Sequence, residues 1–488
     1  MASNINLSRN TKVYFTTNLT SAGAVVDAVG SALNTWELQV LDGYTFTQTN
    51  QQANVMVTEA GATPSRAGRT FNTMLSPADW SFSTYIRPFI DTSIVKPTER
   101  VLWNALLGSA AMDEAGYYSI TAQPTRTTTT GAGASTATVT IVNATATVSP
   151  AIGSLINFHG ATNFADWNQP AVITATSATV AGTATVTVEF AKAPAATSGL
   201  AAVGSSKAFL GQWVPSIGVG TASQNFAYVS TMGANKQQLQ KFGLIFVVDT
   251  VVYALDNCAI DQAVIDFGIA NIATVAWTGK ATTLRKLATL TNSNVVATLA
   301  QSNSAANFIT NKLSTMTLES NIGGNANTNT PAVQYSIPIT GGTLTIANNL
   351  TYLTPSNLGV LNSPTNYFTG ERNISGSVTA YLRTGSLLTG SGADAGALLA
   401  NMLSATGTTA IEPKYRMQLE LGGVSSTTHL EFDMQGVNLM IPTVNVADIV
   451  AATITFNAQP FTPDVNGVSV PAFDLTRTNE LVVRYYSA

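Results

Sequence analysis

Hydrophobic and polar residues alternate along most of this chain, with the period of two that half-buried β-strands have. Clear runs are residues 36–41, 80–87 and 377–383, and Gly, Asn and Pro separate such runs from one another. Thr, Val, Ile and aromatic residues, which favour strands, are frequent in these runs. The pattern predicts a mainly β protein.

Two segments have the spacing of a helix instead. Residues 96–107 begin with Lys-Pro-Thr-Glu, which suits a first helical turn, and an apolar stripe follows from Val101 to Leu106. Residues 393–405 carry Leu and Met at a similar spacing. We expect one short helix in each segment.

Strand and helix patterns recur in the same order along the chain. The run that ends at Arg87 and the run that ends at Arg383 share Ser, Tyr and Arg at an offset of 296 residues. The two helical segments align at this same offset without a gap. Further on, residues 269–275 resemble residues 446–452 at an offset of only 177. Three matches in one order indicate an internal duplication.

The two offsets differ by 119 residues, so the first copy contains an insertion. Residues 124–211 are rich in Thr, Ala, Gly and Val with alternating runs, which predicts a separate small β domain. A length of 488 residues also favours several domains. The predicted division is a first domain at 1–123 and 212–300, an inserted domain at 124–211 and a second domain at 301–488.

The composition favours an assembly. Charged residues make up 10% of the chain, against about 25% in a typical soluble protein, while 45% are hydrophobic. A large surface with so few charges can be kept in solution by burying it against copies of the same chain. The net charge of −4 and the absence of a basic run argue against a protein that grips nucleic acid through its phosphates. Such a surface still allows DNA to slide past.

Targeting and redox signals are few. Cys258 is the one cysteine of the chain, which excludes an intrachain disulfide and a thiolate metal site. The first ten residues are polar and lack the apolar core of a signal peptide. The most apolar stretch, 242–255, is too short to span a bilayer and contains Asp249. We therefore expect a cytoplasm-like compartment and no membrane.

No group of residues supports catalysis. His159 and His429 have no carboxylate or cysteine at ligand spacing. The acidic residues between Asp249 and Asp266 fit no metal or acid–base motif, and caps or turns explain them better. Gly131-Ala-Gly133 and similar pairs lack the lysine of a phosphate loop. The prediction is a protein that is not an enzyme and has no cofactor, catalytic residue or metal site.

At these repeated segments the chain resembles the major tail tube proteins of long-tailed bacteriophages, especially those whose subunit contains two fused tube domains. Outside the insertion, the similarity extends from Arg9 to about Pro460. The matching segments are 9–12, 58–61, 66–72, 80–85, 102–106, 260–263, 275–279, 337–343, 348–355 and 376–382.

The resemblance implies two tandem tail-tube β-sandwich or barrel domains, each with a short flanking helix, in a structural subunit. In this family single-domain subunits form hexameric rings, and double-domain subunits form homotrimers with pseudo-hexameric symmetry. The inner strands of neighbouring subunits join edge to edge around a channel for DNA ejection. Loops and termini connect one ring to the next.

Expected partners are further copies of the chain, tail tip or baseplate proteins, the tail terminator protein, and double-stranded DNA that passes without specific binding. The expected location is the virion tail, after assembly in the host cytoplasm. On the repeated strand, alternate residues face opposite sides, one toward a core and one toward a neighbour or the lumen. The candidates for assembly or structural contacts are Trp80, Phe82, Tyr85, Arg87, Trp103, Trp277, Tyr352, Tyr381 and Arg383.

Two alternatives stay open. One is the inner tube of a contractile tail wrapped by a sheath, and the other is a cell-surface, adhesin-like β protein, which the Thr/Ala/Asn-rich composition suggests. The insertion has no match in the family, and we expect it to project from the outer wall, because it would block a channel. There it would also obstruct a sheath. Acidic and neutral polar side chains are expected in the lumen.

Overall fold

The computed structural model describes most of the strand-forming chain. The described residues are 11–26, 35–55, 69–88, 90–91, 94–95, 97–108, 118–120, 125–127, 135–142, 155–159, 170–177, 183–190, 207–210, 213–215, 224–229, 239–269, 271–287, 295–296, 308–320, 333–357, 362–382, 395–404, 415–423, 428–440, 443–445, 450–459 and 480–487. Within these ranges strands dominate and two segments are α-helical. The predicted mainly β fold is confirmed.

Six strands of the second half close into a barrel. Antiparallel pairing runs from β23 to β24, β27, β31, β29 and β28, and β28 returns to β23. A closed ring leaves none of these strands with an unpaired side along its whole length. The bounds are β23 Thr315–Ser320, β24 Val333–Ala347, β27 Asn373–Tyr381, β28 Tyr415–Leu421, β29 His429–Leu439 and β31 Ala451–Gln459.

Strands of the first half pair in the same cyclic order. β1 pairs with β2, β3 with β6, and the ring continues through β20, β19 and β18 back to β1. The shorter strands β2 and β3 together take the place that β24 has in the second half. The bounds are β1 Thr11–Thr16, β2 Thr35–Leu38, β3 Thr45–Thr47, β6 Ala78–Tyr85, β18 Phe242–Val248, β19 Val251–Gly268 and β20 Thr274–Ala281.

Each half also has one helix and one projecting hairpin at the same place in its chain order. The helices are α1, Arg100–Leu107, and α2, Ala395–Ser404, within the two predicted helical segments. The hairpins follow β3 and β24. They are β4 Asn50–Val55 with β5 Arg69–Leu75, and β25 Leu350–Leu353 with β26 Asn366–Thr369.

Shorter strands complete the network around the two barrels. β32 joins the halves, because it pairs with β29 of the second barrel and with β17 of the segment that leads back to the first. The remaining strands are β7 Ile90–Asp91, β8 Ile94–Val95, β16 Trp213–Pro215, β17 Gln224–Val229, β21 Thr283–Leu287, β22 Val295–Val296, β30 Thr443–Asn445 and β32 Val482–Ser487.

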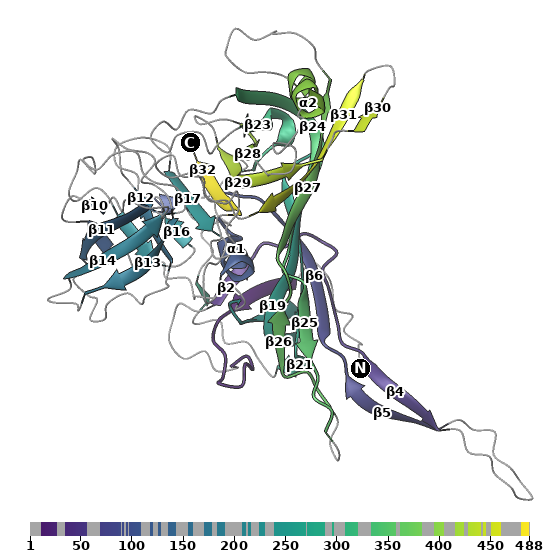
Figure 1. The fold of residues 1–488 in the computed structure, drawn as a ribbon. Coiled ribbons are helices and arrows are strands. Elements are labelled where there is room, and N and C mark those ends of the chain that lie inside the picture. The colour runs from purple at the N-terminus through teal and green to yellow at the C-terminus, as the bar shows by residue number, and fades with distance from the viewer. Residues whose placement is uncertain are drawn as a thin grey trace, which may run out of the picture.

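Residues of the insertion, together with β9 just before it, form a sheet and a core of their own. β11, β14, β13, β12, β15 and β9 pair in a closed ring, and β10 adds to β11. Their apolar side chains form a cluster separate from the main core. The bounds are β9 Tyr118–Ile120, β10 Thr125–Thr127, β11 Ser135–Val142, β12 Leu155–His159, β13 Pro170–Thr176, β14 Thr183–Phe190 and β15 Lys207–Leu210. Figure 1 shows this sheet beside the barrels, on the side where β17 lies.

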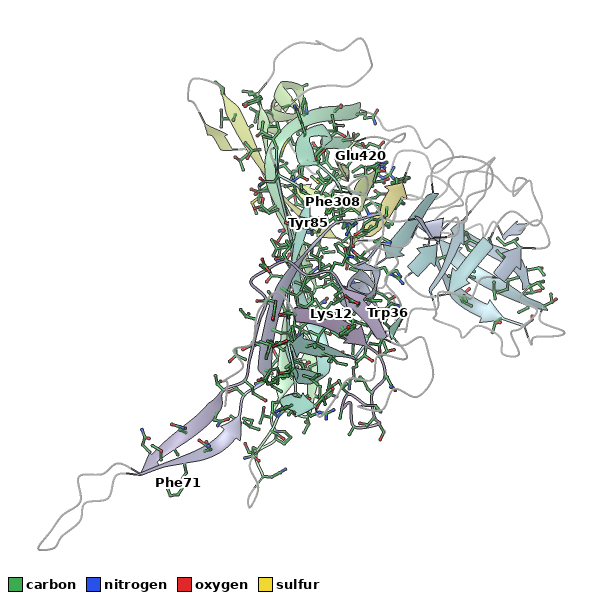
Figure 2. The ribbon with its side chains drawn as sticks, turned by 180° about the vertical axis from the view of Figure 1, so that it is seen from behind. Lys12, Trp36, Phe71, Tyr85, Phe308 and Glu420 are labelled. Carbon is green, nitrogen blue, oxygen red and sulfur yellow. The ribbon has the colours of Figure 1, made fainter. Side chains whose placement is uncertain are left out.

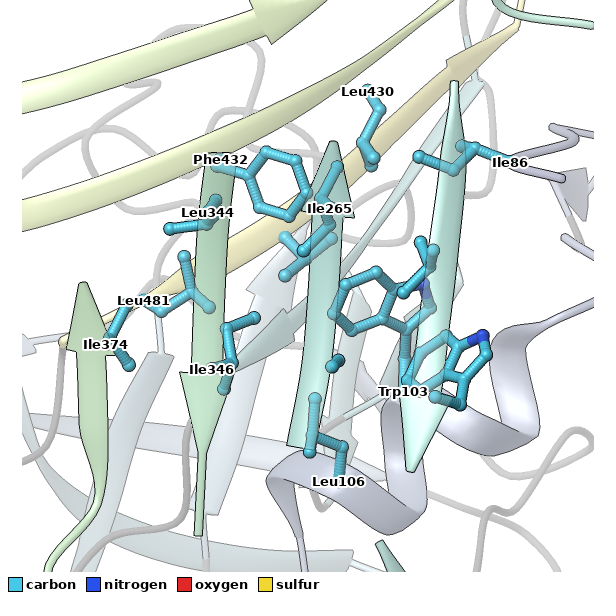
Figure 3. Close-up of a cluster of buried hydrophobic side chains, with 14 of the residues drawn as sticks. Ile86, Trp103, Leu106, Ile265, Leu344, Ile346, Ile374, Leu430, Phe432 and Leu481 are labelled. Atoms are coloured by element: carbon cyan, nitrogen blue, oxygen red, sulfur yellow. The ribbon is translucent and has the colours of Figure 1, made fainter. Parts of the chain in front are cut away.

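One hydrophobic core fills both barrels and the space between them. All eight residues of α1 are buried, so this helix is covered on every side and not on one stripe alone. Trp103 of α1 meets Trp277 of β20 edge to face, with ring centroids 5.0 Å apart. Figure 3 shows Trp103 and Leu106 beside the strand that carries Ile265, which belongs to the boundary between the halves. The halves therefore share a core across that boundary.

Candidate assembly surfaces

The two barrels contribute to one continuous sheet of eight strands. Its order is β3, β6, β20, β19, β24, β27, β31 and β30. The halves join where β19 pairs with β24, over seven residue pairs from Gln262 opposite Ala347 to Gly268 opposite Gly341. We call this sheet the joint sheet, because each half supplies four of its strands.

One face of the joint sheet packs on the core, and the other carries small polar side chains. Along β6, Trp80, Phe82 and Thr84 are buried, while Ser81 and Ser83 are partly exposed. β20 and β31 alternate in the same way. The polar face includes Thr45, Thr47, Ser81, Ser83, Tyr85, Thr274, Thr278, Asp266, Thr343, Thr345, Ser375, Ser377, Thr379, Thr453 and Thr455.

Charge on this polar face is low and balanced. Within the eight described strands the charged residues on it are Asp79, Lys280 and Asp266. Lys280 Nζ lies 2.9 Å from Asp79 Oδ1, so this pair is neutral overall. Asp266 leaves the face weakly acidic. A polyanion gliding along such a surface meets hydroxyl groups and no excess of positive charge.

The joint sheet has a free edge at each end, within the part of the chain that the structure describes. β3 pairs there with β6 alone, and β30 pairs with β31 alone. Val444, in the middle of β30, is 38% exposed although it is apolar. Open edges and exposed apolar side chains favour pairing with another strand.

Apolar residues are also exposed at the two ends of the strands. At one end the hairpins β4–β5 and β25–β26 carry Phe71, Leu353 and Phe368, and Figure 2 shows Phe71 far from the body of the molecule. At the opposite end, the turn from β19 to β20 exposes Ile269 and Ile272. Exposed apolar residues at both ends suit contacts between stacked copies.

A buried hydrogen-bond chain fastens β32 to α1. The indole Nε1–H of Trp103 donates to the Tyr485 hydroxyl, at 2.6 Å, and that hydroxyl donates to Glu99 Oε1, at 2.5 Å. The Thr98 hydroxyl and the Arg87 amide also donate to the Glu99 carboxyl group. Burial nevertheless raises the pKa of Glu99 to about 7.

A second buried polar cluster lies on the second barrel, between β28, β29 and β32. Arg416 and Arg484 both bind the Asp433 carboxylate, at 2.8 and 2.9 Å. Arg484 also binds Glu431 at 2.6 Å. Burial alone would raise the pKa of Asp433, but the two guanidinium groups lower it below its ordinary value. These ion pairs fasten β32 to the barrel wall.

The structure separates the candidate residues named from the sequence into different places. Trp80, Phe82, Trp103 and Trp277 are core residues with almost no exposed surface. Tyr352 is also buried, and its hydroxyl donates to the carbonyl oxygens of residues 257 and 280.

The remaining candidates lie at the sheet surface or beyond the described residues. Tyr85 and Tyr381 occupy matching positions at the ends of β6 and β27, and Tyr381 is exposed. Arg87 donates to Gln39, and its guanidinium lies over the Phe308 ring. Arg383 lies outside the described residues. Their roles in assembly stay a prediction.

Sequence reasoning missed the two free edges. β3 and β30 are three-residue strands, too short for a clear alternating pattern. A signal for β3 was present, since Thr45-Phe46-Thr47 resembles Thr343-Leu344-Thr345 at an offset of 298. A comparison at the fixed offset of 296 misses this match, because the two segments align at 298.

Other features found by sequence have local structural roles. The Asp256 carboxylate accepts from the amide of Val25 and pairs with Arg285, and Asp261 accepts from the amide of Leu350. The His429 ring stacks on Tyr486. Within the described ranges no group of His, Cys, Asp and Glu could hold a metal ion. No described helix has the length and apolar character needed to cross a bilayer.

Comparison with known proteins identifies a phage protein among the relatives of this chain. No family model matches the chain. The tail tube protein pb6 of Escherichia phage T5 is 24% identical to it over 502 aligned residues, which cover 98% of this chain and 79% of pb6. The chain is a homologue of phage tail tube proteins. This relationship supports a structural role in a phage tail, and neither the adhesin-like nor the sheathed alternative is better supported.

Proposed function

We propose that this tail tube protein polymerises into stacked rings, each of three chains, and that the rings enclose the channel through which DNA leaves the virion. Each chain supplies two barrels to its ring, so that six barrels surround the channel. The observation that carries the proposal is the joint sheet, in which two barrels with the same strand order are already hydrogen-bonded side by side. Repeating this arrangement three times gives pseudo-sixfold symmetry.

The polar face of the joint sheet is the face proposed to line the channel. It carries Ser and Thr hydroxyls and a balanced Asp79–Lys280 pair, with Asp266 as the remaining charge. The opposite face is occupied by the core and by α1. On the described strands of this wall the one cationic side chain, Lys280, is paired with Asp79, so DNA phosphates would meet no excess of positive charge, which suits fast passage without specific binding.

The proposed outer wall is the side on which the insertion lies. In Figure 1 the sheet of the insertion stands on the side of α1 and β17, away from the strands of the joint sheet. A module there would decorate the tube without narrowing the channel. It would also obstruct a sheath, which favours a non-contractile tail.

The ends of the strands are the proposed contacts between rings. The hairpins at one end and the β19–β20 turn at the other both expose apolar residues, as stacking requires. The same surfaces would meet the tail tip and tail terminator proteins at the two ends of the tube. We also propose the domain division expected from the sequence, with a first tube domain at 1–123 and 212–300, an inserted domain at 124–211 and a second tube domain at 301–488.

Electron microscopy of the purified full-length chain, alone and with tail tip proteins as nuclei, tests the proposal. Tubes of stacked rings with an open channel are the expected result. A chain that stays monomeric under every condition, nuclei included, would contradict it.

A further inference from the structure

The β19–β24 pairing in the middle of the joint sheet indicates how the two free edges, β3 and β30, could pair with another copy. Both halves place the same kind of strand at the same position. Thr45 of β3 pairs with Ser81 of β6. Thr343 of β24 pairs with Ser377 of β27. Since β6 and β27 align at an offset of 296, Thr45 and Thr343 are equivalent, and so are Phe46 and Leu344.

The other edge has an equivalent as well. Val444 of β30 pairs with Ala452 of β31. Ile265 of β19 pairs with Val275 of β20. β20 and β31 align at the offset of 177, which makes Val444 the equivalent of Ile265.

The joined pair in the middle of the sheet then predicts how the free edges meet. Within the chain Ile265 lies opposite Leu344, and both side chains are fully buried. Their equivalents are Val444, which is 38% exposed, and Phe46, which is half-buried against Phe246 at a ring distance of 4.5 Å. Pairing β30 with the β3 of another copy would bury both side chains as in the middle of the sheet.

We propose that neighbouring copies join by antiparallel pairing of β30 with β3, in the register Thr443 opposite Thr47, Val444 opposite Phe46 and Asn445 opposite Thr45. This inference rests on the proposed function and gives it a residue-level contact. The contact is head to tail, so repetition around an axis closes a ring in which no joint-sheet edge stays unpaired. Every seam of the ring, inside a chain or between chains, then has one geometry.

Cysteine pairs test the register directly. Residues opposite each other in an antiparallel ladder have Cα atoms about 4.5–5.5 Å apart, within the range of about 4.4–6.8 Å that a disulfide needs. The test pair is Thr45→Cys with Asn445→Cys in the full-length chain, assembled and then oxidised. The native Cys258 is fully buried and does not take part.

Two matched controls calibrate the result. Asp266→Cys with Thr343→Cys places the same chemistry on the seam inside the chain, where the two residues lie opposite each other. This variant should form a disulfide within one chain and migrate as a monomer. Thr45→Cys with Thr443→Cys tests a register shifted by two residues.

The expected result is a ladder of covalent oligomers from the test pair, ending at a closed trimer and collapsing to monomer on reduction, with little cross-linking from the shifted pair. Tubes in which the shifted pair cross-links instead would overturn the register. Tubes in which only the seam inside the chain cross-links would overturn the β30–β3 contact. A complete absence of tubes would contradict the proposed function itself, which electron microscopy of the same samples distinguishes.

Discussion

The two barrels fill the same position of their walls in opposite ways. In the first barrel Trp80 of β6 lies opposite Gly279 of β20. In the second barrel the equivalent pair is Gly376 of β27 opposite Phe456 of β31. A large ring faces a glycine in both, but the strand that carries the ring differs.

In both barrels an aromatic ring packs against a glycine on the opposite strand, although the strand that carries the ring differs. A Cβ atom on Gly279 would lie 2.3 Å from the Trp80 ring, and one on Gly376 would lie 2.6 Å from the Phe456 ring. Each ring therefore occupies the space that a side chain on the opposite strand would need. The two halves fill equivalent positions with an aromatic ring from opposite strands, an arrangement that an internal duplication would allow.

Among the predicted changes in stability, the largest should come from removing the Trp80 ring from the first barrel. Trp80→Gly leaves a cavity beside Gly279, and we expect a loss of about 4–6 kcal/mol in the free energy of unfolding. Denaturant unfolding of the unassembled chain measures it. Adding Gly279→Phe to the same variant copies the arrangement of the second barrel. Its Cβ atom would also lie 2.4 Å from the Ala259 carbonyl oxygen, so a recovery of about 1 kcal/mol requires a small shift of β19. A double variant no more stable than the single one would show that the two pairs are not interchangeable.

The ion cluster of the second barrel predicts the next effect. Asp433→Asn leaves Arg416 and Arg484 without their shared carboxylate, and we expect a loss of about 3–5 kcal/mol. Because the folded-state pKa of Asp433 is lowered, its stabilising contribution is present above the ordinary pKa of an aspartate and is lost as the pH falls below it. Acid unfolding curves of the wild type and the variant should converge at low pH. Equal stability at neutral pH would contradict the assigned role.

A smaller effect is expected from the glycine itself. Gly376→Ala places a Cβ atom 2.3 Å from the Thr343 carbonyl oxygen, which is backbone and cannot move freely. We expect a loss of about 1–3 kcal/mol, measured by thermal unfolding. Ser375→Ala on the polar face is the matched control and should change stability by less than about 0.5 kcal/mol. Equal effects of the two substitutions would refute the packing argument.

The smallest predicted effect concerns the buried carboxyl group at the start of α1. The pKa of Glu99 is raised from 4.5 to about 7, so its carboxyl group ionises less readily in the folded state than in the unfolded chain. The stabilisation that protonated Glu99 gives the folded state is therefore complete below pH 4.5 and is lost as the pH rises toward 7. Glu99→Gln should remove this pH dependence and stabilise the chain by about 1 kcal/mol at pH 8. Denaturant midpoints measured across this pH range would show parallel curves if Glu99 did not titrate there.

The sequence was sufficient for much of the fold. Alternation identified β6 and β27 as strands and placed Trp80 and Phe82 on one face of β6, and the fixed offset aligned α1 with α2. These features were predictable because they depend on local periodicity and on repeated segments. The predicted boundaries of the insertion stay a prediction, and the sheet that contains its strands also includes β9, which begins at Tyr118 and closes the ring of strands.

Long-range pairing could not be read in the same way. The seam between β19 and β24 and the bridging position of β32 join residues far apart in sequence, and no local pattern encodes them. The aromatic candidates were identified by residue type, and type alone does not distinguish a core residue such as Trp277 from a surface one. The free edges at β3 and β30 emerge once the pairings of the neighbouring strands are known.

The rotational symmetry of the assembled tube tests the central claim most directly. Cryo-electron microscopy of tubes, reconstructed without imposed symmetry, should give threefold rings whose inner wall is close to sixfold, because each chain supplies two similar barrels. True sixfold rings, with six complete chains around the channel, would contradict the account, since each chain supplies two barrels and twelve barrels, not six, would then surround the channel.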